Sequence, residues 1–191
     1  MKSTLTCLGA LLATAWLAGC ATPPPVATPA STLTAPLMAF EVSGKIAWQQ
    51  DGKGDKARFN WRYTAPKSHM DILSPLGSVA ATLDAERGHV VLETAKGDTF
   101  TASTLEDLTL RLFEQALPLT GLEYWAQGLP IPNLEYTEEN APEGRRLQQK
   151  GWQLDFIRWV QIGERSLPEQ VQLKQGTLSL KLILKDWSPT P

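Results

Sequence analysis

The stretch that decides the fold runs from residue 40 to residue 63. Its first part reads Phe40-Glu41-Val42-Ser43-Gly44-Lys45-Ile46-Ala47-Trp48, in which apolar residues or glycine occupy every second position. After the turn cluster Asp51-Gly52-Lys53-Gly54, the alternation returns in Ala57-Arg58-Phe59-Asn60-Trp61-Arg62-Tyr63. Two such runs joined by a glycine-rich turn predict a β-hairpin. One face is apolar and the other is charged, which is typical of an antiparallel sheet with one face in water.

The same period of two recurs along most of the chain. Short runs lie at residues 70–72, 79–83, 89–93, 99–101, 146–149, 152–160, 171–173 and 178–184. Together with the first hairpin they predict roughly ten or eleven strands. Helical and strand patterns do not alternate along the chain, so the sequence disfavours a parallel sheet.

The apolar period changes in one central insert. Ser103 and Glu106 form a capping-box pattern at the start of a helix predicted over residues 105–113. A second short helix is predicted over residues 122–127 and ends at Gly128. The predicted fold is mainly β (α+β): an unclosed, strongly curved antiparallel β-barrel whose short helical insert packs on the concave side as a lid.

The first twenty residues predict a lipoprotein signal rather than part of the fold. Lys2 supplies a basic head, and the apolar stretch at residues 8–17 is too short to span a bilayer. Leu17-Ala18-Gly19-Cys20 then resembles the lipobox of bacterial lipoproteins, in which the cysteine is joined to diacylglycerol and the chain is cut before it. We predict that residues 1–19 are a signal peptide and that Cys20 is lipidated. The alternative is a secretory signal followed by a chance cysteine.

Residues 20–37 predict a tether between the lipid and a folded domain at residues 38–191. The stretch after Cys20 has no charge and five prolines, which favour an extended chain and exclude a helix. Ala21 follows the cysteine, whereas an Asp there commonly marks inner-membrane retention in enterobacterial lipoproteins. The expected location is therefore the periplasmic face of the outer membrane.

Composition and motifs argue against nucleic-acid binding, a metal site and the common classes of hydrolase. The net charge is −2 and the basic residues are scattered along the sequence, so no nucleic-acid footprint is present and membrane contact is expected to depend on lipid and apolar groups. The positions of the two cysteines and the scarcity of histidine argue against a metal site. No nucleophile-elbow or metalloprotease motif is present. An envelope glycan hydrolase using His69, His89, Glu138 or Glu139 stays as the least favoured hypothesis.

The apolar face of the sheet has two interpretations that the residues leave open. It is either an ordinary filled core or a cavity for an apolar ligand such as acyl chains. Outside that face, Leu76 lies between Pro75 and Gly77 in a turn where no periodic pattern buries it. In a membrane-anchored protein this leucine could enter the bilayer.

A series of motifs resembles the LolB family of outer-membrane lipoprotein receptors. The motifs are the lipobox, Ser43-Gly44-Lys45-Ile46, Phe59-Asn60-Trp61, Leu73-Ser74-Pro75-Leu76-Gly77-Ser78, Leu117-Pro118-Leu119, Leu122-Glu123-Tyr124-Trp125-Ala126-Gln127-Gly128-Leu129-Pro130, Gly151-Trp152-Gln153-Leu154 and the segment from Leu182 to Trp187. They cover nearly the whole predicted mature chain in order.

The resemblance implies a half-barrel that performs no catalysis and needs no cofactor. Such a protein, expected to be a monomer, takes lipoproteins from the periplasmic carrier LolA, holds their acyl chains in an apolar cavity and inserts them into the outer membrane. The resemblance maps the membrane-insertion loop onto Pro75, Leu76 and Gly77. The candidates for cavity or lid are Trp48, Phe59, Trp61, Ile72, Leu112, Trp125, Trp152 and Trp187. The alternative function is a scaffolding envelope lipoprotein with a filled core and no ligand.

Overall fold

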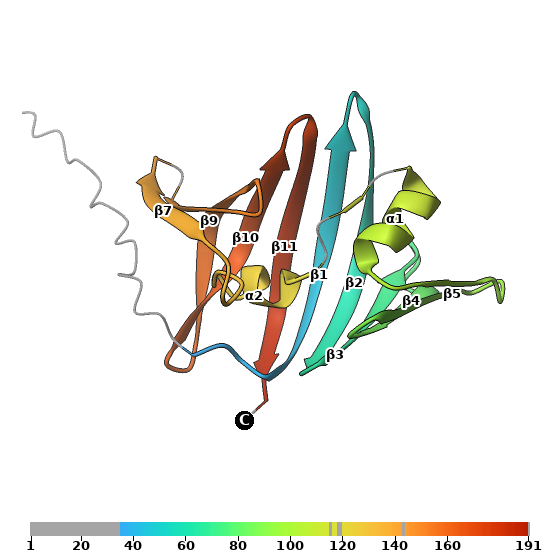
Figure 1. Ribbon diagram of the computed structural model, residues 1–191. Helices are drawn as coiled ribbons and strands as arrows, with labels where there is room; N and C mark the ends of the chain where they lie inside the picture. The colour runs from blue at the N-terminus through green and yellow to red at the C-terminus, as the bar shows by residue number, and fades with distance from the viewer. Residues whose placement is uncertain (1–34, 115, 118–119, 143, 191) are drawn as a thin grey trace, which may run out of the picture.

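The computed structural model describes residues 35–114, 116–117, 120–142 and 144–190. Within these residues the chain forms one eleven-stranded sheet in the order β6-β5-β4-β3-β2-β1-β11-β10-β9-β8-β7 (Figure 1). The strands are β1 (Ala39–Gln50), β2 (Lys53–Thr64), β3 (Lys67–Leu73), β4 (Val79–Glu86), β5 (His89–Thr94), β6 (Thr99–Ala102), β7 (Tyr136–Ala141), β8 (Gly144–Gln149), β9 (Trp152–Ile162), β10 (Arg165–Gln175) and β11 (Leu178–Pro189). The predicted signal peptide, Cys20 and residues 20–34 of the predicted tether lie outside the described residues.

The β1–β2 hairpin forms as its alternation predicts. Gln50 pairs with Lys53, which leaves a two-residue loop of Asp51 and Gly52. Both loop residues have positive φ, 48° and 80°, which is the requirement of a type I′ turn and matches the twist of the strands. The apolar positions of β2 from Phe59 onward are buried, so this hairpin supplies the middle of the core.

The sheet is antiparallel throughout and does not close. The first and last strands, β1 and β11, pair with each other in the middle of the sheet, and β6 and β7 lie at its two ends. Figure 1 shows the sheet curving around the two helices. The predicted unclosed antiparallel architecture is confirmed.

Two short helices cover the concave face of the sheet, as expected from the sequence. They are α1 (Leu105–Phe113) and α2 (Leu122–Ala126). The predicted cap at Ser103 is wrong by one residue, because the Thr104 hydroxyl accepts the hydrogen bond from the Asp107 backbone N–H at 3.0 Å. Glu106 accepts hydrogen bonds from Thr120 instead of closing a capping box.

Two groups of buried apolar side chains lie on this concave face. The larger, called the α2 cluster, comprises Leu37, Phe40, Val42, Phe59, Trp61, Tyr63, Leu117, Leu122, Trp125, Ala126, Leu147, Trp152, Leu154, Phe156, Leu167, Val171, Leu173, Leu178, Leu180, Leu182, Leu184 and Trp187. The smaller, called the α1 cluster, comprises Leu83, Val90, Leu92 and Leu108. Half-buried Met70 packs against both clusters, so the apolar face is continuous across the sheet.

The core that holds the sheet together is complete within residues 35–190. This segment contains all the described strands, both helices and both apolar clusters. Over the described part of the chain, neither helix has the length or the apolar character needed to cross a membrane.

Candidate functional site: the loop at residues 74–78 and the concave face

The loop at residues 74–78 is a braced turn between β3 and β4. The Ser74 N–H donates to the Ser78 carbonyl at 2.8 Å, and the Gly77 N–H donates to the Ser74 carbonyl at 3.0 Å. The hydroxyls of Ser74 and Ser78 lie 2.9 Å apart. Gly77 has a φ of 94°, which glycine adopts without the steric cost that other residues incur. These bonds fix the shape of the loop.

Arg58 attaches this loop to the sheet and leaves its apolar tip in solvent. The Arg58 Nη2 donates to the carbonyl oxygens of Ser74 at 3.1 Å and Pro75 at 2.9 Å. Leu76, at the tip, is 97% exposed, which exceeds the exposure of every other large apolar side chain that the structure describes. The loop therefore exposes an apolar side chain to solvent while hydrogen bonds fix its backbone.

The eight residues predicted to line a cavity or lid do not form one group. Five are buried among the α2 cluster: Phe59, Trp61, Trp125, Trp152 and Trp187. Trp48 is half-buried at the margin of the same cluster, whereas Ile72 and Leu112 are half-buried against the α1 cluster. Ile72 and Leu112 therefore pack against the same small cluster, apart from the other six.

Aromatic rings fill one end of the α2 cluster. The Phe40 ring lies 5.1 Å from Trp61, 5.3 Å from Tyr63 and 5.2 Å from Trp187, between ring centroids. The Trp187 indole N–H donates to the Pro168 carbonyl at 3.1 Å. Rings at these separations add attraction to the burial of their area, so this end is a packed core.

Buried Gln149 holds α2 and the segment after it against β8. Its Oε1 accepts hydrogen bonds from the Trp125 indole N–H at 2.9 Å and from the Ile131 backbone N–H at 2.8 Å. Its Nε2 donates to the carbonyl oxygens of Ile131 and Leu134 at 2.9 and 3.3 Å. Sequence reasoning missed this residue because a glutamine in a polar stretch resembles a solvent-facing one.

Arg145 is a second buried polar group that fixes the end of α2. It donates to the Gly128 carbonyl at 2.5 Å and forms a two-point ion pair with Glu138 at 2.5 and 2.8 Å. Its guanidinium lies over the rings of Phe156 and Trp159, 5.3 and 6.0 Å from their centroids. Gly128 has a φ of 76°, and a Cβ there would meet Trp159 at 2.6 Å, so glycine ends α2 as predicted.

The start of the described chain is fixed to the body beside α2. Buried Gln127 accepts the Leu37 N–H at 2.6 Å and donates to the Leu37 carbonyl at 3.3 Å. Arg165 donates to the Ala35 carbonyl at 2.8 Å. The last residues of the predicted tether, 35–37, therefore belong to the folded body.

Residues beneath α1 are smaller and less covered than those beneath α2. Of the α1 leucines, Leu108 is buried, Leu105 and Leu112 are half-buried, and Leu110 is 51% exposed. The half-buried partners on the sheet and beside it include three alanines: Ala81, Ala85 and Ala102. Small side chains under a nine-residue helix leave this part of the concave face easier to open than the aromatic end.

Two acidic groups near α2 have raised pKa values. Burial raises the pKa of the Glu123 carboxyl on α2. Burial also raises the pKa of Tyr63 to about 12, and the charge of Glu123 adds to that shift. Both shifts have the same cause, which is the apolar surroundings that α2 and β2 create.

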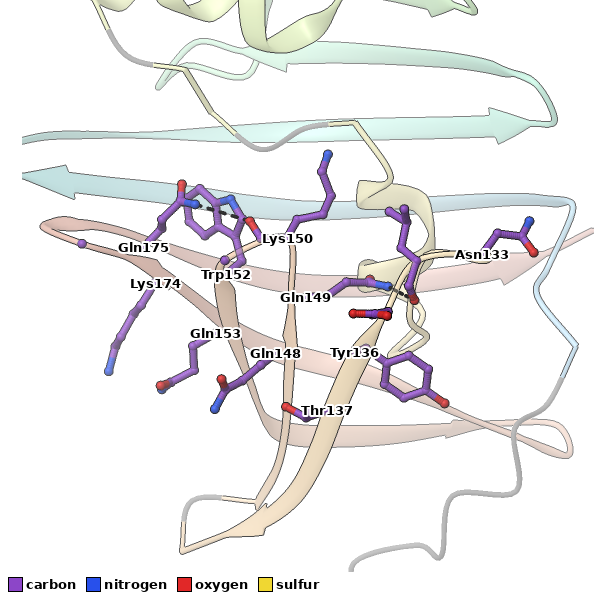
Figure 2. A pocket seen from close by; sticks show the side chains of 14 residues that line it. Asn133, Tyr136, Thr137, Gln148, Gln149, Lys150, Trp152, Gln153, Lys174 and Gln175 are labelled. Carbon is purple, nitrogen blue, oxygen red and sulfur yellow. Dashed lines mark hydrogen bonds between the residues drawn. The ribbon is translucent and has the colours of Figure 1, made fainter.

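A wide groove lies at the end of the sheet formed by β7, β8 and β9, and its lining is more polar than the α2 cluster. It has a volume of about 1100 Å³ and is lined from β7, β8, β9 and the β10–β11 turn. Figure 2 shows that its lining includes amides and lysines such as Gln148, Gln153 and Lys174, with the edge of Trp152 among them. Such a lining does not suit an acyl chain, which gains free energy only by contact with apolar groups.

The residues that an enzyme hypothesis would use are spread over the sheet. His69 lies in β3, 2.7 Å from Asp84, whereas His89 begins β5. Glu138 and Glu139 lie in β7 and pair with neighbouring arginines. Within the described ranges, no group of three or more His, Cys, Asp or Glu residues could hold a metal ion.

Comparison with known proteins assigns the family. The model of the family described as "Outer membrane lipoprotein LolB" matches residues 38–187. The chain belongs to the LolB family. Outer-membrane lipoprotein LolB of Chromobacterium violaceum is 33% identical over 148 residues, which are 78% of this chain and 79% of that protein. The LolB protein of Azoarcus sp. (strain BH72) is 30% identical over 179 residues, 93% of this chain and 92% of that protein.

A solved structure supports the fold independently. A DUF1329 family protein from Desulfovibrio piger has a TM-score of 0.52 at 11% identity, covering 80% of this chain and 85% of that one. At that identity the likeness concerns the fold alone. Membership of the LolB family supports a role in outer-membrane lipoprotein localization, and it confirms the resemblance found in the sequence motifs.

Proposed function

We propose that this protein accepts lipoproteins from the periplasmic carrier LolA, holds their acyl chains on its concave face and inserts them into the outer membrane. The observation that carries the proposal is the braced loop at residues 74–78 with its exposed tip, Leu76. A soluble scaffold gains nothing from a leucine fixed in water, whereas a protein that must reach into a bilayer does.

The acyl chains are proposed to lie beneath α1. Half-buried Met70, Ile72, Ala81 and Leu112 offer apolar surface that is only partly used in the closed structure. Each methylene buried there gains about 0.8 kcal/mol, so a chain can displace the weak contacts that hold the helix down. The binding step then amounts to lifting α1 from the sheet.

Release follows from the loop. Burying a leucine side chain in hydrocarbon gains about 1.5–3 kcal/mol, so Leu76 draws the protein onto a bilayer once it touches the surface. Hand-off needs no energy source if each apolar environment binds the acyl chains better than the one before. A difference of about 1.4 kcal/mol favours each step tenfold. The proposed activity is therefore transfer without catalysis or cofactor.

The protein is proposed to act while anchored at the periplasmic face of the outer membrane. Cys20 would carry the lipid, and the residues after it would link it to the folded body. Near the start of that body, Gln127 accepts a hydrogen bond from the Leu37 N–H. Several acyl chains hold a protein firmly where one chain gives reversible binding.

The test is Leu76→Glu, with Leu134→Glu as a matched control. Leu134 is also an exposed leucine, but it lies at the polar groove rather than on the loop. The Leu76 variant should accept a lipoprotein from LolA as the wild type does and then fail to insert it into liposomes, while the control inserts normally. Normal insertion by the Leu76 variant contradicts the proposal.

The scaffold alternative draws support from the dense aromatic packing of the α2 cluster. It predicts that no acyl chain binds saturably to any part of the concave face. Binding of an apolar fluorophore separates the two functions when Leu112→Glu is compared with Leu110→Glu. Because Leu112 faces the sheet and Leu110 faces solvent, lipid handling predicts a loss of binding in the first variant alone.

A further inference from the structure

The convex face of the central strands gathers positive charge that the net charge of the chain conceals. Besides Arg62, which pairs with Glu41, the exposed basic side chains on this face of β1, β2 and β11 are Lys45, Lys56, Arg58, Lys181 and Lys185. We call these five residues the basic patch. The chain as a whole carries a net charge of −2, so the patch arises because positive charges are gathered on one face and not because the chain has more basic than acidic residues. These residues are scattered along the sequence, and strand pairing brings them onto one face.

Strand register places these charges beside one another. Lys45 lies directly opposite Arg58 across the β1–β2 pair. Ala47 pairs with Lys56 on one side and with Lys181 on the other, which puts those two lysines two strands, or about 10 Å, apart.

Acidic partners are scarce at the patch. Among the described residues, none of its four lysines forms an ion pair. Two acids adjoin it: Asp186 on β11, which accepts a hydrogen bond from the Ser43 hydroxyl at 2.5 Å, and Asp55 on β2, which accepts the Lys56 backbone N–H at 2.7 Å. Like charges that lie directly opposite destabilise a sheet, so Lys45 facing Arg58 has an energetic cost.

Elsewhere the convex face does pair its charges. Glu41 and Arg62 lie 2.7 Å apart across β1 and β2. In the other half of the sheet, Arg146 and Asp155 lie 2.5 Å apart. The convex face therefore pairs charges on β1 and β2 themselves as well as in the other half of the sheet, whereas the four patch lysines make no such pair. The exception points to a negatively charged partner.

Arg58 connects the patch to the insertion loop. Arg58 is one of the five patch residues, and its Nη2 donates hydrogen bonds to the carbonyl oxygens of Ser74 and Pro75. The loop that carries Leu76 is therefore bonded directly to a side chain of the patch. Lysines suit lipid phosphates as compact point charges, whereas lysine is depleted at protein–protein interfaces.

We propose that the basic patch binds the headgroups of anionic phospholipids and thereby holds Leu76 against the bilayer. This inference rests on the proposed role of Leu76 in insertion and adds the lipid class that the protein prefers. Each lysine near an anionic surface contributes about fivefold to binding, which corresponds to about 1 kcal/mol. The attraction weakens with salt because the charges are exposed.

The experiment uses residues 20–191 with Cys20→Ser, which contain the whole core and lack the lipid. Flotation with vesicles of phosphatidylcholine, with and without phosphatidylglycerol, measures binding at low and high ionic strength. Lys45→Gln combined with Lys181→Gln should lower binding to the anionic vesicles by about 25-fold and leave binding to neutral vesicles unchanged. The matched control combines Lys67→Gln, at the start of β3 where Lys67 pairs with Glu86, with Lys96→Gln in the β5–β6 turn, which removes the same charge outside the patch.

Two results would overturn the proposal. One is equal binding of the patch variant and the control to anionic vesicles. The other is a patch variant that binds vesicles normally but no longer accepts lipoproteins from LolA, which would make this face a protein-docking surface. Insertion of lipoproteins by the Leu76→Glu variant is measured in a separate assay. If the patch variant binds anionic vesicles like the control, the patch proposal fails but the proposed function stands. If Leu76→Glu inserts lipoproteins normally, the proposed function itself fails.

Discussion

The two halves of the concave face bury apolar side chains in different ways. Beneath α2, aromatic rings surround Phe40, and the buried polar groups of Gln149 and Arg145 fix the helix and the segment after it. Beneath α1, leucine and alanine side chains are half-covered, and the helix contacts the sheet through buried Leu108 and through the hydrogen bond that Arg111 donates to the Thr101 carbonyl.

The proposed function requires one sheet to combine a permanent core with a surface that opens, and the two halves differ in that sense. Stability resides where packing is dense and polar groups have fixed partners. Regions that must move are drawn from the less stable parts of a fold. In this protein, the α2 half fits the role of core, and the α1 half fits the proposed acyl-chain site.

The largest effect is expected from Trp125→Ala in the α2 half. Trp125 is 1% exposed, and its indole N–H donates to Gln149. Truncating a buried tryptophan costs about 3–5 kcal/mol, so the free energy of unfolding measured in urea should fall by that amount. A loss below about 1 kcal/mol would mean that the α2 half is not the core.

A smaller effect is expected from Leu108→Ala in the α1 half. Leu108 is equally buried, but the half-covered side chains around it can move into the space it leaves. The expected loss of unfolding free energy is about 2 kcal/mol, at the low end of the range for leucine truncation. Leu154→Ala in the α2 half is the matched comparison and should cost more; an equal cost would erase the distinction between the two halves.

The smallest effect is expected from Asp155→Asn, on the convex side of the α2 half, and it concerns how the free energy of unfolding changes at low pH. Burial opposes ionisation of Asp155, but hydrogen bonds from Arg146 and Gln153 outweigh it and lower the pKa of the carboxyl below 3.8. This carboxylate stabilises the fold above pH 3.8, and the contribution is lost as pH falls through the lowered pKa. Asp155→Asn should therefore cost about 1.5 kcal/mol at neutral pH and flatten the decline of stability in acid.

Urea unfolding at several pH values checks the Asp155 prediction. Hydrogen exchange then locates the change, which should appear first in β8 and β9, where Arg146 and Asp155 pair across the strands. An unchanged pH profile in the variant would show that another carboxylate governs the acid response.

The sheet was predictable because its period is regular. Phe59, Trp61 and Tyr63 alternate with polar residues, and the two-residue turn before them has the chemistry that its positive φ values require. The helix α1 was predicted with its observed bounds, but its cap was placed one residue early, because Ser103 and Thr104 are both good caps and only the backbone conformation decides between them.

The polar groups inside the fold were not predictable from their pattern. Arg145, Leu147 and Gln149 all point inward on β8, so two of the three buried positions carry residues typical of a solvent face. Their partners, such as Gly128 and Ile131, come from a distant segment that only the fold brings near. The basic patch was missed for the same reason, since its charges meet through register rather than sequence.

Photocrosslinking tests most directly the claim that acyl chains bind beneath α1 while the α2 half stays closed. A client lipoprotein with a diazirine on its acyl chain is transferred from LolA, irradiated, and the labelled peptides are identified. We predict that the label falls on peptides containing Ile72, Ala81 or Leu112. Labelling concentrated around Leu147 and Leu173, in the packed α2 half, would contradict the account.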